Sequence, residues 1–540
     1  MTRLGARLVA AVAGFALVLT GCGKIDSGGG QQPQQPSGAD TRAVKAGGTL
    51  RLALDAEPDK LDPTVSRTLV GRIVFSSMCQ ALYDINEKLE FVPLLAAALP
   101  EISADGKTVK IKIRTGLRFA DGTTMDAAAV KTSLDRHRTM EGSNRRSELS
   151  PVTDVTVADP ATVELHLSAP YAPLTAQLVD RAGMIMSPAA LAKGGDFATA
   201  PVCIGPFKYA TRVAQDRIEV VKDPNYYDAA KVKLDKIIFK TITDANSRFT
   251  NLRTGDVDVI FNVSPINVDE LKSISTLRLI TTESLGYQGI TVNIGNNAGL
   301  GKDPGPLAAP YANPMASDAR VRKAFSLAID REALVRTVFR GVHAPACGPI
   351  SAISPLASDA SQACPKHDVA EAKKLLAEAG VPTPVKTNLT VINNPDAVRI
   401  GEAIKSMTAE AGFDVQLEPT EFAAALDLND AGKFQMFRIG WSGQVDADGN
   451  ITRFFQTKGS QNNSGYSNPE IDQWLTDARA SQDVAKRREL YGKVIKKIQE
   501  DNPIIYLYRQ KNLIATTDKV AQVKMYSDYV IRLETAGFVE

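Results

Sequence analysis

Several common features are scarce or missing in this chain. Its 540 residues include only four histidines, His137, His166, His343 and His367, which are scattered. After residue 20, no apolar run approaches the about 20 residues that a membrane-spanning helix needs. Neither charge is in excess, with 63 Lys and Arg against 61 Asp and Glu. These absences argue against a histidine-based metal site, a membrane-spanning body and the concentrated basic surface of a nucleic-acid-binding protein.

The usual signatures of hydrolases are also missing. The sequence contains no G-x-S-x-G, no H-E-x-x-H and no nucleophile beside a base. Asp446 and Asp448 form a carboxylate pair, but no neighbouring feature assigns acid and base roles to them. We therefore predict that the protein is not an enzyme and uses no cofactor or metal.

The N-terminal residues have the pattern of an export signal. Arg3 and Arg7 precede a short apolar run, Leu8 to Leu19, that ends in small residues. Leu19-Thr20-Gly21-Cys22 resembles a bacterial lipoprotein cleavage box, which implies that residues 1–21 are removed and that Cys22 is lipidated. The alternative is a plain secretory signal followed by an incidental cysteine. We predict an extracytoplasmic protein held on the outer face of the membrane by this lipid alone.

The residues after Cys22 predict a flexible tether. Residues 28–40 contain no large apolar side chain, and such a segment cannot bury enough surface to order itself. We place the tether at residues 22–45. Without the signal segment, which holds Arg3 and Arg7, the basic and acidic side chains of the chain balance.

Four further cysteines suggest two disulfides, as expected outside the cytoplasm. Cys347 and Cys364 flank one short loop and are the best pair, and Cys79 with Cys203 follows by elimination. A zinc site is the alternative, but the spacing contains no C-x2-C.

Strand and helix patterns alternate along the body. Val109, Ile111 and Ile113 alternate with basic residues, as in a half-buried strand. A hairpin is predicted across Asp159-Pro160, and a βαβ unit from strand 389–392, helix 396–411 and strand 413–417. Asp368 and Asp330 are predicted helix caps, the second for helix 331–339. The pairs Arg487-Arg488 and Lys496-Lys497 are expected on the solvated face of an amphipathic helix. The prediction is an α/β protein of two or three domains.

Residues 105–136 resemble a segment of the family 5 extracellular solute-binding proteins of ABC importers, the oligopeptide- and dipeptide-binding group. The matching positions are Asp105, Gly106, Lys107, Arg114, Gly116, Phe119, Asp121, Gly122, Ala127 and Val130. Further matches occur in order at 47–50, 61–63, 205–207, 225–227, 234–237, 255–258, 318–331 and 466–472. The resemblance covers residues 45–540.

The resemblance implies a two-lobed type II periplasmic-binding-protein (Venus flytrap) fold of cluster C, with an extra subdomain in the first lobe. The expected boundaries are 46–285 for lobe I with the subdomain at about 94–200, 286–505 for lobe II, and 506–540 returning to lobe I. The implied function is a monomeric, lipid-anchored substrate-binding subunit that captures di- or oligopeptides between its lobes and delivers them to permease subunits in the membrane. Two alternatives remain: the same fold binding haem, a sugar, an opine or a metal complex, and a regulatory or scaffold lipoprotein without transport.

The expected ligand contacts come from loops and strands that face the cleft in this family. They are Thr64, Ser66 and Arg67 from lobe I, Tyr287 and Gln288 from the crossover, and Arg438, Trp441, Ser442, Gly443, Gln444 and Asp446 from lobe II. Trp441 is either an apolar wall or a core anchor. Arg67 either binds a ligand carboxylate or forms a surface salt bridge. Arg453 is a further candidate.

One position departs from the dipeptide-binding pattern. Gln444 stands where those proteins carry an aspartate that pairs with the peptide's amino group. A neutral amide holds a buried ammonium less well than a carboxylate does, because burying an ion is costly without compensation. Asp446 or Asp448 could take over this role. If neither does, peptides with a free amino terminus are in doubt.

Overall fold

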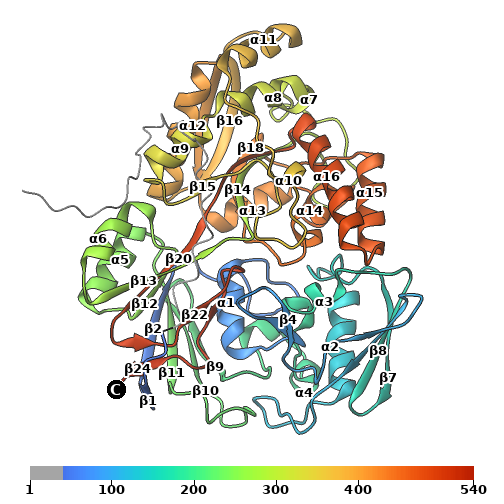
Figure 1. Ribbon diagram of the computed structural model, residues 1–540, viewed down its shortest axis with the longest axis vertical. Helices are drawn as coiled ribbons and strands as arrows, with labels where there is room; N and C mark the ends of the chain where they lie inside the picture. Colours follow the sequence, from blue (N-terminus) through green and yellow to red (C-terminus); the bar gives the residue numbers. More distant parts are fainter. Residues whose placement is uncertain (1–39) are drawn as a thin grey trace, which may run out of the picture. The chain divides into compact units, whose positions relative to one another are not determined.

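The computed structural model describes residues 40–540, so the predicted signal segment, Cys22 and most of the predicted tether lie outside the described residues. Within the described part, a seven-stranded and a six-stranded sheet each form the centre of one lobe (Figure 1). No helix among residues 40–540 is long and apolar enough to cross a membrane.

The seven-stranded sheet defines the first lobe. Its central strand, β2, buries Leu50, Leu52 and Leu54, and it has parallel neighbours on both sides. In spatial order the strands are β13 Leu277–Glu283, β20 Lys511–Thr517, β12 Val259–Phe261, β2 Thr49–Leu54, β11 Lys236–Thr241, β10 Arg217–Lys222 and β9 Phe207–Val213. Three helices pack on these strands: α1 Leu69–Met78, α5 Ala245–Thr254 and α6 Val268–Ser273.

A smaller antiparallel sheet forms the predicted subdomain of the first lobe. Its order is β5 Glu101–Ile102, β6 Thr108–Lys112, β8 Thr162–Leu167 and β7 Val152–Asp159, and α2 Ala127–Thr139 packs against it. The predicted strand and hairpin are confirmed, since Val155 pairs with Leu165 and Val157 with Val163. Shorter elements nearby are β3 Tyr83–Ile85, β4 Phe91–Pro93, α3 Leu174–Gln177 and α4 Pro188–Ala192.

The six-stranded sheet defines the second lobe. Its order is β15 Ala344–Pro345, β19 Ile504–Arg509, β14 Tyr287–Val292, β18 Met436–Trp441, β16 Val385–Ile392 and β17 Phe413–Thr420. The main helices are α8 Ala319–Ala328, α9 Arg331–Val338, α11 Val369–Ala379, α12 Pro395–Ala409, α13 Phe422–Asp430, α14 Asp448–Phe455, α15 Pro469–Ala480 and α16 Val484–Asp501. Short helices α7 Pro314–Ser317 and α10 Asp359–Gln362 complete it.

The predicted βαβ unit and helix caps are confirmed in the second lobe. β16 and β17 are parallel along their whole length, with α12 between them in sequence. Asp368 caps α11 by accepting a hydrogen bond from the backbone N–H of Glu371, and Asp330 caps α9 in the same way. Each capping aspartate lies within three residues of the backbone N–H that it binds, and the sequence alone therefore predicts where these helices begin.

The chain crosses twice between the lobes. It leaves the seven-stranded sheet after β13 and enters the six-stranded sheet at β14. The second predicted boundary, at 505/506, falls inside β19, which remains paired with β14 at Tyr508 and with β15 at Arg509. The return therefore comes between β19 and β20.

The ordered body begins slightly earlier than the predicted end of the tether. β1 Val44–Lys45 pairs with β24 Gly537–Val539, which in turn pairs with β21 Val520–Ala521. The Arg42 guanidinium also donates hydrogen bonds to the backbone carbonyls of Asp518 and Val520. A second short pair at this end of the chain joins β22 Lys524–Met525 to β23 Ile531–Arg532. C-terminal strands thus order residues whose composition alone resembles a linker.

Both predicted cysteine pairs lie at disulfide distance. Cys79 and Cys203 have Cα atoms 4.9 Å apart, and Cys347 and Cys364 have Cα atoms 5.1 Å apart. The first pair is buried in the core of the first lobe, and it joins the end of α1 to the segment before β9.

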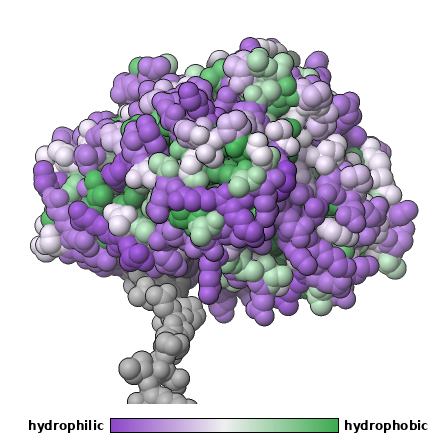
Figure 2. Space-filling view, turned by 90° about the horizontal axis from the view of Figure 1, so that it is seen from above, coloured by the Kyte–Doolittle hydropathy of each residue, from purple (hydrophilic) through white to green (hydrophobic). Residues whose placement is uncertain are grey.

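The molecular face seen in Figure 2 is mostly hydrophilic, with apolar residues in small groups. The most exposed large apolar side chains among the described residues come from separate elements of both lobes: Leu99, Ile102, Val157, Val213, Ile353, Leu428 and Val484. No single large apolar patch covers the face shown in Figure 2.

Candidate functional site

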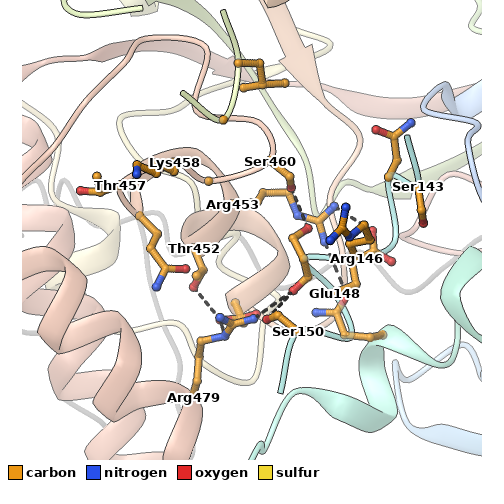
Figure 3. Close-up of a pocket in the computed structure, with 18 of the residues that line it drawn as sticks. Ser143, Arg146, Glu148, Ser150, Thr452, Arg453, Thr457, Lys458, Ser460 and Arg479 are labelled. Atoms are coloured by element: carbon orange, nitrogen blue, oxygen red, sulfur yellow. Dashed lines mark hydrogen bonds and ion pairs between the residues drawn. The ribbon is translucent and has the colours of Figure 1, made fainter. Parts of the chain in front are cut away.

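A cavity of about 620 Å³ lies between the two lobes. The first lobe contributes residues of the polar loop 142–150 together with Gln177. The second lobe contributes α14, the segment 456–460 that follows it, and Arg479 of α15. Figure 3 shows these side chains converging from both lobes. The lining from the second lobe comprises Leu300, Gly301, Asp448, Thr452, Arg453, Gln456, Thr457, Lys458, Gly459, Ser460 and Arg479.

Positive charge dominates the lining of this cavity. Its cations are Arg146, Arg453, Lys458 and Arg479, while its acids are Glu148 and Asp448. Both acids are already paired: Asp448 lies 3.1 Å from Arg479 Nε, and Glu148 lies 3.2 Å from Arg453 Nη1. The cavity therefore presents an electrostatic surface that favours an anionic solute.

Helix α14 places several of these groups. The loop before it is anchored by Asn450, whose Oδ1 accepts hydrogen bonds from the Trp441 indole N–H and the Gln444 backbone N–H, at 2.9 and 2.7 Å. Asp446 Oδ1 accepts the backbone N–H of Asp448 at the start of the helix. With its first turn held in this way, α14 directs Arg453 toward the first lobe.

Direct polar contacts join the lobes around the cavity. Gln444 Nε2 donates to Asp180 Oδ2 at 3.3 Å, and Ser147 Oγ donates to Ser460 Oγ at 2.8 Å. Arg67 forms an ion pair with Asp430 at the end of α13. The described structure is thus a state in which both lobes contact each other around the cavity.

Asp180 is the buried acid that faces Gln444. Its carboxylate lies 3.1 Å from Arg72 Nε and 3.6 Å from Arg181 Nε. Burial raises the pKa of Asp180, but the positive charges of Arg72 and Arg181 outweigh burial and hold that pKa well below its usual range. Asp180 is therefore ionised and is already paired with Arg72 and Arg181.

Asp446 does not reach the cavity. Its two oxygens accept hydrogen bonds from Arg487 of α16, at 2.8 and 2.6 Å. The sequence prediction that Arg487 lies on a solvated face is wrong, because this side chain is buried, while its neighbour Arg488 is exposed. Arg487 turns inward because Asp446, far away in sequence, compensates its charge.

The residues predicted from the first lobe lie beside the cavity lining rather than in it. Thr64 is fully buried, and its hydroxyl lies 2.9 Å from His137 Nδ1. Ser66 donates to Asp59 at 3.0 Å. Arg67 forms the ion pair with Asp430, which agrees with the salt-bridge alternative for this residue.

The residues predicted from β14 and β18 pack within the second lobe. Tyr287 contacts Tyr506 edge to face, with ring centroids 4.8 Å apart. Arg438 donates to the Tyr508 hydroxyl at 2.7 Å and to Gln288 Oε1 at 3.3 Å. None of these side chains lines the cavity.

The loop after β18 and the end of that strand contact both Leu285, in the first crossing between the lobes, and the cavity residue Arg453. The Trp441 ring packs against Phe454, and the Arg453 guanidinium lies 5.1 Å from the ring centroid. Ser442 Oγ accepts a hydrogen bond from Arg72 Nη1 of the first lobe at 3.5 Å. Gly443 has a φ of +88°, and a Cβ there would meet the Leu285 carbonyl carbon at 2.3 Å, so this position requires glycine.

The sequence thus identifies the neighbourhood of the cavity but misses most of its lining. Of the candidates considered, Arg453 and Asp448 line it, and Gln444 touches Arg453 from outside the lining. The missed residues come from loop 142–150, from the segment 456–460 and from scattered positions of both lobes. In loop 142–150, Arg145-Arg146 followed by Glu148 is a visible charge cluster. Nothing local distinguishes that cluster from an ordinary surface loop. The predicted ligand contacts therefore remain predictions.

We expect the protein to lose stability in mild acid through His137. This ring is fully buried, and burial lowers the pKa of His137 from 6.5 to about 4. Between these two pH values, the His137 ring binds a proton in the unfolded chain but not in the folded one. The free energy of unfolding therefore falls as the pH falls from 6.5 toward 4. The share of His137 in the expected loss between pH 7.5 and pH 5 is about 2 kcal/mol, measured by urea denaturation. His343, whose pKa burial also lowers, to about 3, adds a share of its own that a change at His137 leaves in place.

The matched variants for this test are His137→Gln and His166→Gln. The first removes the buried ring and with it this part of the pH dependence. The second removes a half-buried histidine of the same lobe and leaves the dependence in place. Identical pH profiles for the wild-type protein and His137→Gln would contradict the assignment.

Comparison with known proteins decides the family. The model of the bacterial extracellular solute-binding proteins, family 5 (middle region), matches residues 90–463. The chain belongs to this family. It is therefore an extracytoplasmic solute-binding protein of an ABC importer and not an enzyme. This confirms the family resemblance and the two-lobed type II fold expected from the sequence.

Individual relatives resemble the chain over almost its full length. The glutathione-binding protein GsiB of Pectobacterium atrosepticum is 28% identical over 505 residues, which cover 91% of this chain and 94% of GsiB. The structure of AgaA from A. tumefaciens R10 with agropinic acid is 27% identical, with a TM-score of 0.81 and coverage of 91% and 99%. Helicobacter pylori DppA, solved with the peptide STSA, shares the fold at 21% identity and a TM-score of 0.81, with coverage of 92% and 99%.

Proposed function

We propose that the protein captures a short peptide bearing more than one carboxylate and delivers it to its permease. The observation that carries this proposal is the cavity between the lobes, whose four cationic side chains outnumber its two acids. Both acids are neutralised by arginines that line the same cavity. Of the two remaining cations, Lys458 forms an ion pair with Asp303 outside the lining at 2.7 Å. Binding of a carboxylate solute would balance the charge of Arg146.

The relatives support a small peptide. The relative GsiB is named as a glutathione-binding protein, and glutathione is a tripeptide with two carboxylates. The cavity, at about 620 Å³, lies within the usual size range of small-molecule binding sites. A tripeptide of this kind matches both its size and its charge.

A non-peptide carboxylate solute is the second candidate. AgaA, the relative of solved structure at 27% identity, was solved with agropinic acid. The cations that line the cavity would attract the carboxylate of such a solute in the same way, because this attraction does not require a peptide bond.

We further propose that a lipid on Cys22 holds a monomeric body at the outer face of the membrane. The support is the cleavage-box pattern before Cys22 and the pairing of β1 with β24, which fixes where the chain enters the body. Two acyl chains would anchor the protein stably.

Calorimetry of the purified protein tests the charge of the ligand. We compare an acidic tripeptide carrying two carboxylates with its diamide, which has the same shape. We expect the diamide to bind at least about tenfold more weakly, because a hydrogen bond to a charged group is worth roughly 1.5–3 kcal/mol. Native mass spectrometry of protein from peptide-rich medium would identify the natural ligand. Equal affinity for acid and diamide would contradict the proposal.

Two arginine variants test whether the cavity, rather than the general surface charge, attracts the dicarboxylate. Arg146 is an exposed cation that lines the cavity, and Arg253 is an exposed arginine of the first lobe that does not. We expect Arg146→Gln to weaken binding of the dicarboxylate and Arg253→Gln to leave it unchanged. Equal effects of both variants would mean that general surface charge, rather than the cavity, attracts the ligand.

A further inference from the structure

Arg453 is the most highly connected charge at the junction of the lobes. Its Nη1 donates to Glu148 Oε1 at 3.2 Å, and its Nη2 contacts Gln177 at 3.5 Å, both in the first lobe. The same Nη2 donates to Gln444 Oε1 at 3.1 Å in its own lobe. The guanidinium also lies against the Trp441 ring, 5.1 Å from its centroid.

These contacts are those that a ligand's ammonium group would need. A buried cation requires a carboxylate, further acceptors and, where available, an aromatic face. Around Arg453 the carboxylate is Glu148, the acceptors are the amide oxygens of Gln177 and Gln444, and the aromatic face is Trp441. Arg453 itself is buried and lines the cavity. The protein therefore fills this cation position with a side chain of its own.

The remaining acids near the junction do not offer a second position. Asp180 is held by Arg72 and Arg181, and its other oxygen accepts from Gln444. Asp446 is held at both oxygens by Arg487. Asp448, which lines the cavity, lies 3.1 Å from Arg479 Nε. None of these three carboxylates is left without a cationic partner of its own.

Glu148 Oε2 is a carboxylate oxygen that could still accept a hydrogen bond from a ligand. This atom is buried and has no hydrogen-bond partner among residues 40–540. However, Glu148 Oε1 already accepts from Arg145 at 2.7 Å and from Arg453 at 3.2 Å. An ammonium at Oε2 would be a third cation beside a single carboxylate. A neutral donor suits that oxygen better, because it satisfies the acceptor without adding positive charge.

We infer that Arg453 determines specificity by standing in for the ligand's ammonium, so that the site selects acidic solutes without requiring a free amino group. This inference rests on the proposed function, because it concerns which carboxylate ligands the same cavity accepts. It assigns to Arg453 a second role besides attracting carboxylates. It also accounts for a neutral side chain at Gln444, since an aspartate there would place a second carboxylate beside Asp180.

The test compares one acidic tripeptide with a free amino terminus and the same peptide with an acetylated one. We expect wild-type protein to bind the two with dissociation constants within about threefold of each other. A site that pairs an ammonium with a carboxylate would instead lose roughly 10- to 100-fold on acetylation. A tenfold or larger preference for the free amine would overturn the inference while leaving the proposed function intact. Binding of neither peptide would remove both.

If the inference holds, removing Arg453 should give the protein a preference for peptides with a free amino terminus. Arg453→Met keeps an extended side chain but removes the internal cation and leaves Glu148 with Arg145 as its one remaining cationic partner. We expect the ratio of free-amine to acetylated affinity to rise about tenfold in this variant. Arg146→Gln removes a cavity cation that is not bonded to Glu148, so both affinities should fall and the ratio should stay constant. An unchanged ratio in folded Arg453→Met would contradict the inference, and if that variant does not fold, the wild-type comparison decides.

Discussion

Replacing Cys79 and Cys203 together by alanine is expected to lower the free energy of unfolding by about 5 kcal/mol. The cysteines are 124 residues apart, so the cross-link removes a large loop-closure entropy from the unfolded chain. The measurement is guanidinium denaturation of wild-type and variant protein. Its denaturant dependence should also steepen, because the variant exposes more surface on unfolding.

The second cysteine pair is a matched control. Cys347 and Cys364 are only 17 residues apart, so their double alanine variant should lose about 3 kcal/mol. A larger loss for this short loop than for the long one would contradict the entropic account. Such a result would mean that the disulfide acts mainly on the free energy of the folded state rather than on the entropy of the unfolded chain.

Replacing Asp446 by asparagine is expected to lower the free energy of unfolding by about 3–5 kcal/mol. Arg487 is buried and takes both of its charge-assisted hydrogen bonds to carboxylate from Asp446. The variant leaves that guanidinium buried without its counter-charge. Thermal and denaturant unfolding measure the loss, and Asp427→Asn, at a highly exposed carboxylate, should change stability by no more than about 0.5 kcal/mol.

This variant also separates two roles for Asp446. If the residue bound a ligand's amino group, its replacement would weaken free-amine peptides selectively and leave stability nearly unchanged. We expect the reverse. The double variant Asp446→Leu with Arg487→Met should recover much of the lost stability, because an apolar pair of similar volume avoids the cost of burying charge. Failure of the double variant to recover any stability would contradict this explanation.

The two arginine predictions from the sequence show what local pattern can and cannot decide. For Arg67 the sequence supports a ligand contact and a surface salt bridge equally, because its partner Asp430 is not among the neighbouring residues. For Arg487 beside Arg488 the sequence predicts a solvated face, because adjacent charges usually lie on a surface. In both cases a carboxylate distant in sequence decides the outcome, at separations of 363 and 41 residues.

The sequence by itself determined the family, the alternation of strands and helices, and the helix caps. Each of these depends on periodicity, composition or ordered short motifs, which act over short stretches of chain. The tertiary structure alone decided the lining of the cavity and the internal cation Arg453. Its partner Glu148 lies 305 residues away on the opposite lobe, and the two charges meet only because both lobes have folded and come together.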